Sequence, residues 1–265
     1  EGQKSYAYLV YLIGELYYFG SENGHIKVDA KKGFDYIKKA GNLGYAVAQN
    51  QLGNFYVRSR KIPRTNFAEA YKWYKLAVAN GSLDARKAYL LSNEKDFVEQ
   101  YPYCISQGRT LIGDAYLIGN GGLLKDNAKA IEWYNKAYGV DHVSPVEVGL
   151  AKAYMASGDN KKALTYAKEA ITQPYAPAFL VMVELTDDKV EKYIYLSIAI
   201  SLFKYPELKF WSQFNENCLP DLSENGIDSA KKQLSKISLD DSQKEQFEKM
   251  TKNIESHWKT EAAIN

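Results

Sequence analysis

The feature that most constrains this 265-residue sequence is a pair of short blocks that recurs along the chain. The first block places a Tyr three residues after a Gly, as in Leu52–Tyr56 and Ile112–Tyr116. The second ends with Trp-Tyr-x-x-Ala, as in Glu69–Ala77 and Lys129–Ala137. Self-similarity of this kind indicates helix pairs that bury their apolar faces only by stacking on one another.

Two series of small residues keep the same register through these copies. The first helices carry Gly14, Gly53, Gly113 and Ala151, and the second helices close with Ala40, Ala77, Ala137 and Ala170. A small residue lets the paired helix approach closely, and an aromatic three residues later lies on the same helical face. Gly44, Gly81 and Gly139 follow the second helices, where a C-terminal cap favours glycine. The wide gap before Gly113 predicts a short extra helical unit around residues 85–101, closed by Pro102.

The link between the two helices identifies the type of repeat. The two units at Gly53 and Gly113 have long links, whereas the unit at Ala151 has a short one. Residues Leu111–Ala137 match the pattern Leu-Gly-x-x-Tyr, Gly, Lys-Asp-x-x-Lys-Ala-x-x-Trp-Tyr-x-Lys-Ala, with Ile112 in place of Leu. The units at Gly14, Gly53 and Gly113 therefore resemble Sel-one-like repeats, which are related to tetratricopeptide repeats. The resemblance extends over about residues 5–172, although Gly33 replaces an Ala, residues 58–64 form a basic loop and residues 82–102 are degenerate.

This resemblance implies an all-α fold, namely a right-handed α-solenoid of stacked antiparallel helix pairs with a helical C-terminal cap. We expect the repeat array over residues 1–172 and degenerate helix pairs with capping helices, continuous with the array, over residues 173–265. Tyr193–Phe203 is apolar nearly all round, which predicts a buried helix. Ser238–Asp241 is a plausible helix start. The following helix is expected to cover the end of the stack with the stripe Phe247, Met250, Ile254 and Trp258.

Charge and motifs exclude several classes of function. The chain has 34 Lys and Arg against 32 Asp and Glu, too balanced for a nucleic-acid-binding surface, so we expect neither DNA nor RNA as partner. The three histidines are widely spaced, and the sequence lacks the motifs of serine hydrolases, zinc proteases and phosphate-binding loops. We therefore predict no enzyme activity, cofactor or metal. Gly119–Gly122 is interpreted as the repeat family's loop. No apolar stretch reaches the about 20 residues that span a bilayer.

The two cysteines leave the cellular compartment open. Cys104 and Cys218 could form one disulfide in an oxidising compartment or remain as two buried thiols. Buried free thiols are the commoner arrangement, so the sequence favours them. The chain starts at Glu1 without an initiator Met or signal sequence, which suggests a trimmed start and is compatible with a preceding signal peptide or lipid anchor.

A row of polar positions on the first helices is the predicted partner-binding surface. In tetratricopeptide-type solenoids these helices line the concave face, and by that analogy we predict a protein-binding row. It consists of Tyr11, Glu15, Asn50, Asn54, Arg58, Thr110, Asp114 and Lys152. The alternative is that these are ordinary solvated positions. Replacing Asn54 and Asp114 by Arg is expected to weaken binding without lowering the melting temperature.

A basic loop follows this row. Arg60, Lys61 and Arg64 could dock an acidic partner or an anionic membrane face, or simply be solvated.

The resemblance implies a non-catalytic protein–protein interaction module of a bacterial cell envelope. The leading hypothesis is an immunity protein that binds and neutralises a toxic effector enzyme, such as a type VI secretion phospholipase. The alternatives are a scaffold for envelope assembly or polysaccharide export, and a secreted host-directed adaptor. An enzyme with a cryptic pocket is the hypothesis from a different class. A periplasmic or outer-membrane lipoprotein location is expected, with cytoplasmic or secreted locations as alternatives.

Overall fold

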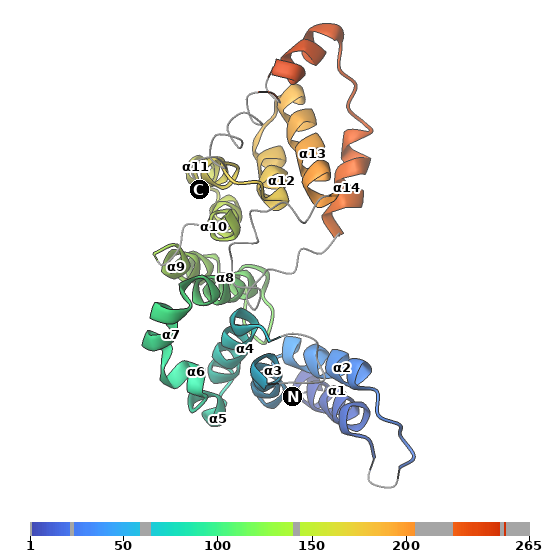
Figure 1. Cartoon of the computed structure of the whole chain (residues 1–265), viewed down its shortest axis with the longest axis vertical. Coiled ribbons are helices and arrows are strands. Elements are labelled where there is room, and N and C mark those ends of the chain that lie inside the picture. Colours follow the sequence, from blue (N-terminus) through green and yellow to red (C-terminus); the bar gives the residue numbers. More distant parts are fainter. Residues whose placement is uncertain are drawn as a thin grey trace. The chain divides into compact units, whose positions relative to one another are not determined.

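The computed structural model describes residues 2–21, 24–58, 65–139, 144–204, 225–249 and 252. These residues form helices and their connections without a β-strand, which confirms the all-α prediction. They divide into two compact units (Figure 1). Unit 1 comprises the described residues up to 139, and unit 2 those from 144 onward. The division falls before the fourth helix pair, whereas the repeat pattern of the sequence fades only after residue 172.

Unit 1 is built from three helix pairs and a short helical insertion. The pairs are α1 (Gly2–Phe19) with α2 (Ala30–Asn42), α3 (Ala46–Arg58) with α4 (Phe67–Ala79), and α8 (Pro102–Ile118) with α9 (Asn127–Tyr138). The insertion contains α5 (Leu83–Arg86), α6 (Tyr89–Ser92) and α7 (Glu94–Gln100), where the sequence predicts a short extra unit. Pro102 is the first residue of α8, a position at which its missing N–H costs nothing.

The second helix of each pair in unit 1 begins with the same cap. Asp29, Asn66 and Asp126 each accept a hydrogen bond from the backbone N–H three residues later, which satisfies one of the unpaired donors of a helix start. The N–H of each cap also donates to a tyrosine carbonyl of the preceding helix. These acceptors are, in order, Tyr17 (2.8 Å), Tyr56 (2.9 Å) and Tyr116 (2.9 Å). Because the three caps share these two hydrogen bonds, the second helix of each pair starts at the same position relative to the first, even though the links differ in composition.

The recurring glycine of the first helix accommodates a ring of the second. A Cβ added at Gly53 would lie 2.5 Å from the Tyr74 ring, and one at Gly113 would lie 2.5 Å from the Tyr134 ring. In the first pair, a Cβ at Gly14 would lie 2.6 Å from Ile37. Any larger residue would force these helices apart, so the predicted close approach at this position is confirmed.

The glycine-rich loop after α8 packs against the earlier pairs of unit 1. The buried side chain of Gln49 donates to the carbonyls of Gly41 (2.8 Å) and Gly121 (2.9 Å). Asn80 donates to Gln49 Oε1 and to Gly121, so the polar groups of this network have partners. Gly122 lies against Gly44, whose φ of +87° requires glycine. Gly119–Gly122 is therefore a structural element of the array.

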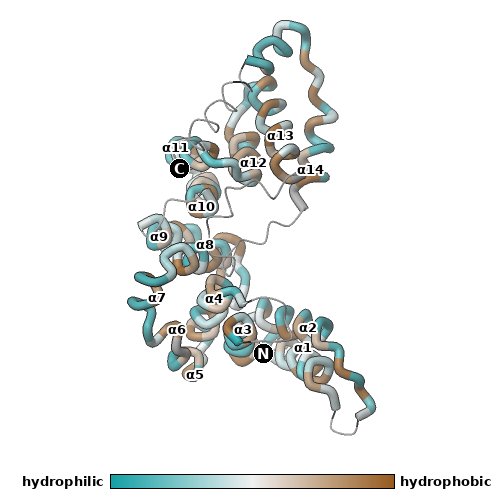
Figure 2. The backbone as a smooth tube through the Cα atoms, viewed as in Figure 1, coloured by the Kyte–Doolittle hydropathy of each residue, from teal (hydrophilic) through white to brown (hydrophobic). Residues whose placement is uncertain are grey.

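Unit 2 contains α10 (Ser144–Ala156), α11 (Asn160–Ala170), α12 (Ala176–Leu185), α13 (Lys189–Lys204), α14 (Asn225–Leu234) and a helix over residues 241–249. Its core is centred on α12 and α13, both of which carry apolar segments in Figure 2. The burial of Ile194, Leu196 and Ala199 confirms the predicted buried helix. Asp240 and Gln243 form a reciprocal capping box at the predicted helix start. Phe247 packs on Tyr193. The stripe residues Met250, Ile254 and Trp258 lie outside the described residues.

Three further predictions from the sequence concern the cysteines, the glycine after α9 and membrane-spanning helices. Cys104 is buried and disulfide-bonded, so the preference for two free thiols is wrong. Cys218, the chain's second cysteine, lies outside the described residues. Gly139 follows α9 with a right-handed φ of −67°, so glycine is not required there for its conformation. Among the described helices, none is long and apolar enough to cross a membrane.

Candidate functional site

Two residues of the predicted binding row are engaged by tyrosines of the paired helix. Tyr74 donates its hydroxyl to Asn54 Oδ1 at 2.9 Å, and Tyr134 donates to Asp114 Oδ1 at 2.7 Å. Both acceptors directly follow the glycine on which the ring lies. Burial, and then the charge of Asp114, raise the pKa of Tyr134. Asn54 and Asp114 thus have a structural role that their sequence pattern alone does not reveal.

The remaining members of the row differ in exposure. Glu15 accepts a hydrogen bond from Gln51 of α3 at 2.6 Å and lies beside Tyr11, whose pKa is raised by burial and by this carboxylate. Thr110 is buried and donates to the Ser106 carbonyl, so the expectation that it faces solvent is wrong.

Three members make no side-chain hydrogen bond to a described residue. Asn50 is half-buried and Arg58 is exposed, both on α3. Lys152 is exposed but belongs to unit 2, whereas all other members of the row belong to unit 1. Within unit 1 the row ends at Asp114. Arg60, Lys61 and Arg64 of the basic loop lie outside the described residues.

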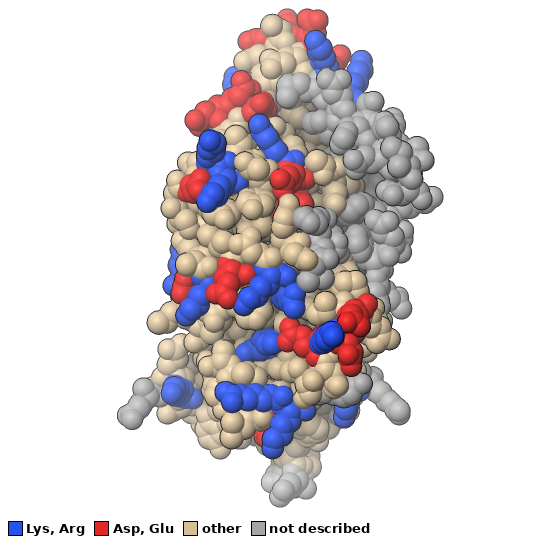
Figure 3. All heavy atoms as spheres, turned by 90° about the vertical axis from the view of Figure 1, so that its left-hand side faces the viewer, with Lys and Arg blue, Asp and Glu red and all other residues tan. Residues whose placement is uncertain are grey.

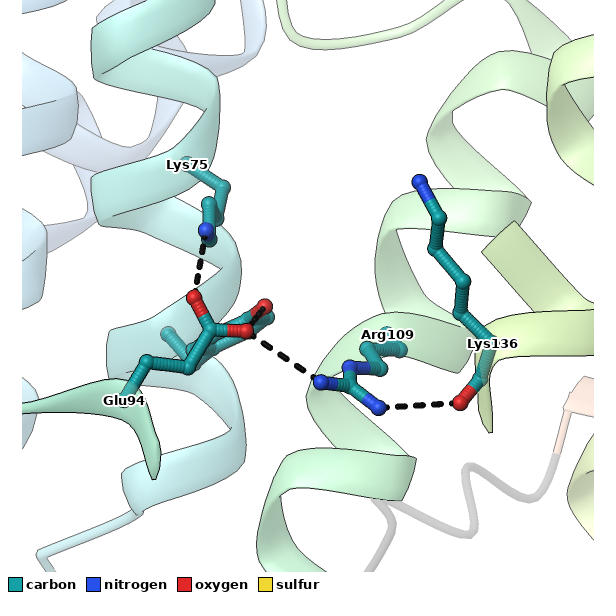
Figure 4. Close-up of polar contacts among 5 residues, drawn as sticks. Lys75, Glu94, Arg109 and Lys136 are labelled. Carbon is teal, nitrogen blue, oxygen red and sulfur yellow. Dashed lines mark hydrogen bonds and ion pairs between the residues drawn. The ribbon is translucent and has the colours of Figure 1, made fainter. Parts of the chain in front are cut away.

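A half-buried ion cluster anchors the inserted helices to unit 1 (Figure 4). Glu94 of α7 accepts from Tyr71 (2.6 Å) and Lys75 (2.7 Å) of α4 and from Arg109 of α8 (3.2 Å). Arg109 also donates to the Lys136 carbonyl of α9 at 2.9 Å. Burial alone would raise the pKa of Glu94, but the hydrogen bonds from Lys75 and Tyr71 outweigh it and hold that pKa below its ordinary value. One carboxylate therefore ties the insertion to the repeats on both sides of it.

This anchoring creates a pocket of about 280 Å³ between α3, α4 and the insertion. Helix α3 contributes Asn54, Val57 and Arg58, and α4 contributes Phe67 and Tyr74. The insertion contributes Lys87, Ala88, Leu90 and Phe97. Phe67 and Phe97 meet edge to face with centroids 6.0 Å apart, which fixes α7 against α4. The pocket is close to the lower end of the volumes typical of ligand sites.

The pocket combines apolar walls with positive charge. Arg58 and Lys87 are exposed, and neither forms an ion pair with a described residue. Among the described residues that line the pocket, none is an Asp or Glu. Burial raises the pKa of Tyr74, while the nearby Arg58 cation acts in the opposite direction. The arrangement can bind a carboxylate at its rim and an apolar group against its aromatic walls, because guanidinium and ammonium donors match carboxylate acceptors.

Sequence reasoning found part of this pocket. Asn54 and Arg58 were in the predicted row, whereas Lys87, Phe67 and Phe97 were missed. Lys87 lies in the degenerate segment, where the repeat pattern gives no position to compare, so no signal in one sequence would have found it. The face drawn in Figure 3 carries both charges, whereas the described lining of the pocket contains two cationic residues and no acidic one.

Comparison with known proteins supports the repeat assignment. A family model described as Sel1 repeat matches residues 7–45, 46–82 and 107–138. A Sel1 repeat protein from Oxalobacter formigenes is 20% identical, with 86% of this chain and 88% of that one covered and a TM-score of 0.35. A protective antigen of uropathogenic Escherichia coli with an SLR fold is 15% identical, with 98% of this chain but 56% of that one covered and a TM-score of 0.35. No curated protein matches the chain.

Sel1 repeats are protein-interaction modules and generally act as non-catalytic scaffolds. The three matched segments coincide with the pairs α1–α2, α3–α4 and α8–α9. The Sel-one-like resemblance is thereby confirmed, and the chain carries three Sel1 repeats, all of them in unit 1.

Proposed function

We propose that this protein binds a partner protein through the pocket between α3, α4 and the insertion, without performing chemistry on it. The observation that carries this proposal is the pair Arg58 and Lys87, two cations that form no ion pair with a described residue and line the pocket with its aromatic walls. Desolvated pockets that take an anchoring side chain contribute a disproportionate share of binding free energy at protein interfaces.

The size and charge of the pocket determine which side chains of a partner it can bind. Its size suits one or two side chains, and its charge favours a carboxylate. An apolar or aromatic residue next to an Asp, Glu or terminal carboxylate would place its apolar part against the walls formed by Phe67 and Phe97. The carboxylate would then meet Arg58 and Lys87. The basic residues Arg60, Lys61 and Arg64, which follow Arg58 in the sequence, would add attraction for an acidic partner.

As to the partner's identity, we propose a toxic effector enzyme that this protein neutralises in the cell envelope. The disulfide at Cys104 supports a location outside the reducing cytosol, because disulfides persist mainly in oxidising compartments. The alternative partner is a component of envelope assembly or polysaccharide export, for which this protein would be a scaffold. Both functions use the same anchor, and they differ in what the bound partner does.

The proposal is tested by affinity capture from envelope and secreted fractions of the source organism. The bait is the full chain, either unchanged or with Arg58→Glu and Lys87→Glu. The matched control carries Lys31→Glu and Lys125→Glu, which change the net charge equally at exposed sites of unit 1 that do not line the pocket. Circular dichroism and melting curves verify that all three proteins are folded.

We expect one acidic partner to bind the unchanged chain and the control, and to be lost from the pocket variant. Inhibition of a captured enzyme at one-to-one stoichiometry supports neutralisation, and several structural envelope proteins support a scaffold. Equal capture by the pocket variant and the control would refute the pocket as the binding site. Turnover of a substrate by the protein alone would refute the non-catalytic assignment.

A further inference from the structure

Helix α1 is apolar on two opposite faces. One face is buried against other helices of unit 1. It consists of Ala7, Val10, Gly14 and Tyr18. The other carries exposed apolar side chains along its length. These are Tyr6, Leu9, Leu12, Ile13, Leu16 and Phe19, whereas Tyr8, which is also exposed, lies to one side of this face and contacts Tyr45. A helix that is hydrophobic all round is normally buried, so this second face lacks the cover that its composition calls for.

The repeats show what happens to this face in the other first helices. Leu9 corresponds in register to Ala48 of α3 and Gly108 of α8, and Ile13 corresponds to Leu52 and Ile112. Leu9 and Ile13 are 56% and 39% exposed, whereas Ala48, Leu52 and Ile112 are 0%, 0% and 2% exposed. In α3 and α8 the face packs on the second helix of an earlier pair. In α1 the same positions form a repeat interface that no described residue covers.

The six residues that form this face are arranged symmetrically along α1. Leu9 and Leu16 lie equally far from the midpoint between Leu12 and Ile13, and so do Tyr6 and Phe19. Two copies of α1 laid antiparallel about that midpoint would place each residue of a pair opposite the other. Self-complementarity of this kind is the requirement of a two-fold interface.

The charge of the helix is compatible with self-association. Lys4 and Glu15 are the charged residues of α1, and Glu15 is bound by Gln51 within unit 1. An antiparallel pair would therefore bring no like charges together along the apolar stripe. We infer that this face of α1 binds the same face of a second copy of the chain, as an antiparallel helix pair about a two-fold axis.

The first test measures the oligomeric state of the full chain across a concentration series by sedimentation velocity. We expect a dimer whose Kd rises more than about 100-fold in the double variant Leu9→Glu/Ile13→Glu, because charges would be buried without partners. Leu124→Glu is the matched control, since Leu124 is 88% exposed in unit 1 but lies in the loop after α8. It should dimerise like the unchanged chain.

The second test fixes the geometry with single cysteines and a short thiol cross-linker. Leu12→Cys should cross-link efficiently between copies, because both sulfurs lie beside the axis. Phe19→Cys should not, since the antiparallel pair would separate the two sulfurs by about 20 Å along the helices. The unchanged chain under the same conditions controls for its own cysteines.

Three results would overturn the inference. They are a monomer at every concentration, a dimer that persists in the Leu9→Glu/Ile13→Glu variant, and equal cross-linking at both cysteine positions. The first would leave the face to a helix of another protein or to a lipid surface. None of these results bears on the pocket proposal, which rests on α3, α4 and the insertion.

Discussion

The glycine at the contact between paired helices gives the sharpest prediction of stability. In Gly113→Ala, the added Cβ would lie 2.5 Å from Cε1 and 2.7 Å from Cδ1 of Tyr134, a ring that is fully buried. Restoring a normal carbon–carbon contact requires a shift of about 1 Å, and overpacking of this kind costs about 1–3 kcal/mol. The same shift would break the bond from Tyr134 to Asp114, which contributes about 1.5–3 kcal/mol if the acceptor is charged.

The better helix propensity of alanine offsets about 1 kcal/mol of this cost. We therefore expect Gly113→Ala to lower the free energy of unfolding by about 2–5 kcal/mol, measured by denaturant titration with circular dichroism. Gly139→Ala is the matched control. Its φ is −67° and its added Cβ would have its nearest neighbour at 3.5 Å, so it should be neutral or stabilising by up to about 1 kcal/mol.

A double-mutant cycle separates the steric cause from other effects. In a Tyr134→Ala background the ring is absent, so adding Gly113→Ala should no longer destabilise the protein and should instead recover about 1 kcal/mol of helix propensity. Equal destabilisation by Gly113→Ala with and without the ring would refute the reasoning, as would a Gly113→Ala variant as stable as the unchanged chain.

Four further predictions follow from the same contacts. Asp114→Arg should lower the melting temperature more than Asn54→Arg, because Asp114 is a charged acceptor of a fully buried hydroxyl; equal melting temperatures would contradict this. Glu94→Gln should destabilise the protein near neutral pH, and by progressively less as the pH falls below the ordinary Glu pKa of about 4.3, because a carboxylate whose pKa is lowered by folding loses its contribution on acidification; denaturant titrations over a pH series measure it. Burial, with Glu191 and Asp188, raises the pKa of Tyr195 to about 12, so stability should fall as pH rises from about 10 toward that value, as alkaline melting curves would show. Reduction with dithiothreitol should lower stability by about 2–5 kcal/mol, and Cys104→Ser should be insensitive to the reductant.

The sequence by itself determined the repeated architecture of unit 1. Gly53 and Gly113 carry this information because a helix contact too close for a Cβ excludes every other residue. Ala77 and Ala137 carry it because they recur in the same register near the end of each second helix, where both are fully buried. Such requirements are local, or recur at a fixed spacing, so they are visible without coordinates.

Only the tertiary structure decided which polar residues are available for binding. Tyr74 and Tyr134 reach Asn54 and Asp114 from a different helix, 20 residues along the chain, so exposure could not be inferred from the first helix alone.

The pocket depends still more on the tertiary structure. Lys87 is brought to the same pocket as Arg58 by the path of an insertion that has no repeat pattern, and Glu94 holds that path through contacts with two other helices. The exposed face of α1 has the same origin, because burial at a repeat interface depends on whether a neighbour is present. The periodic pattern of the sequence predicts the contacts that all repeats share. The candidate binding sites lie where the repeats differ, so the pattern does not predict them.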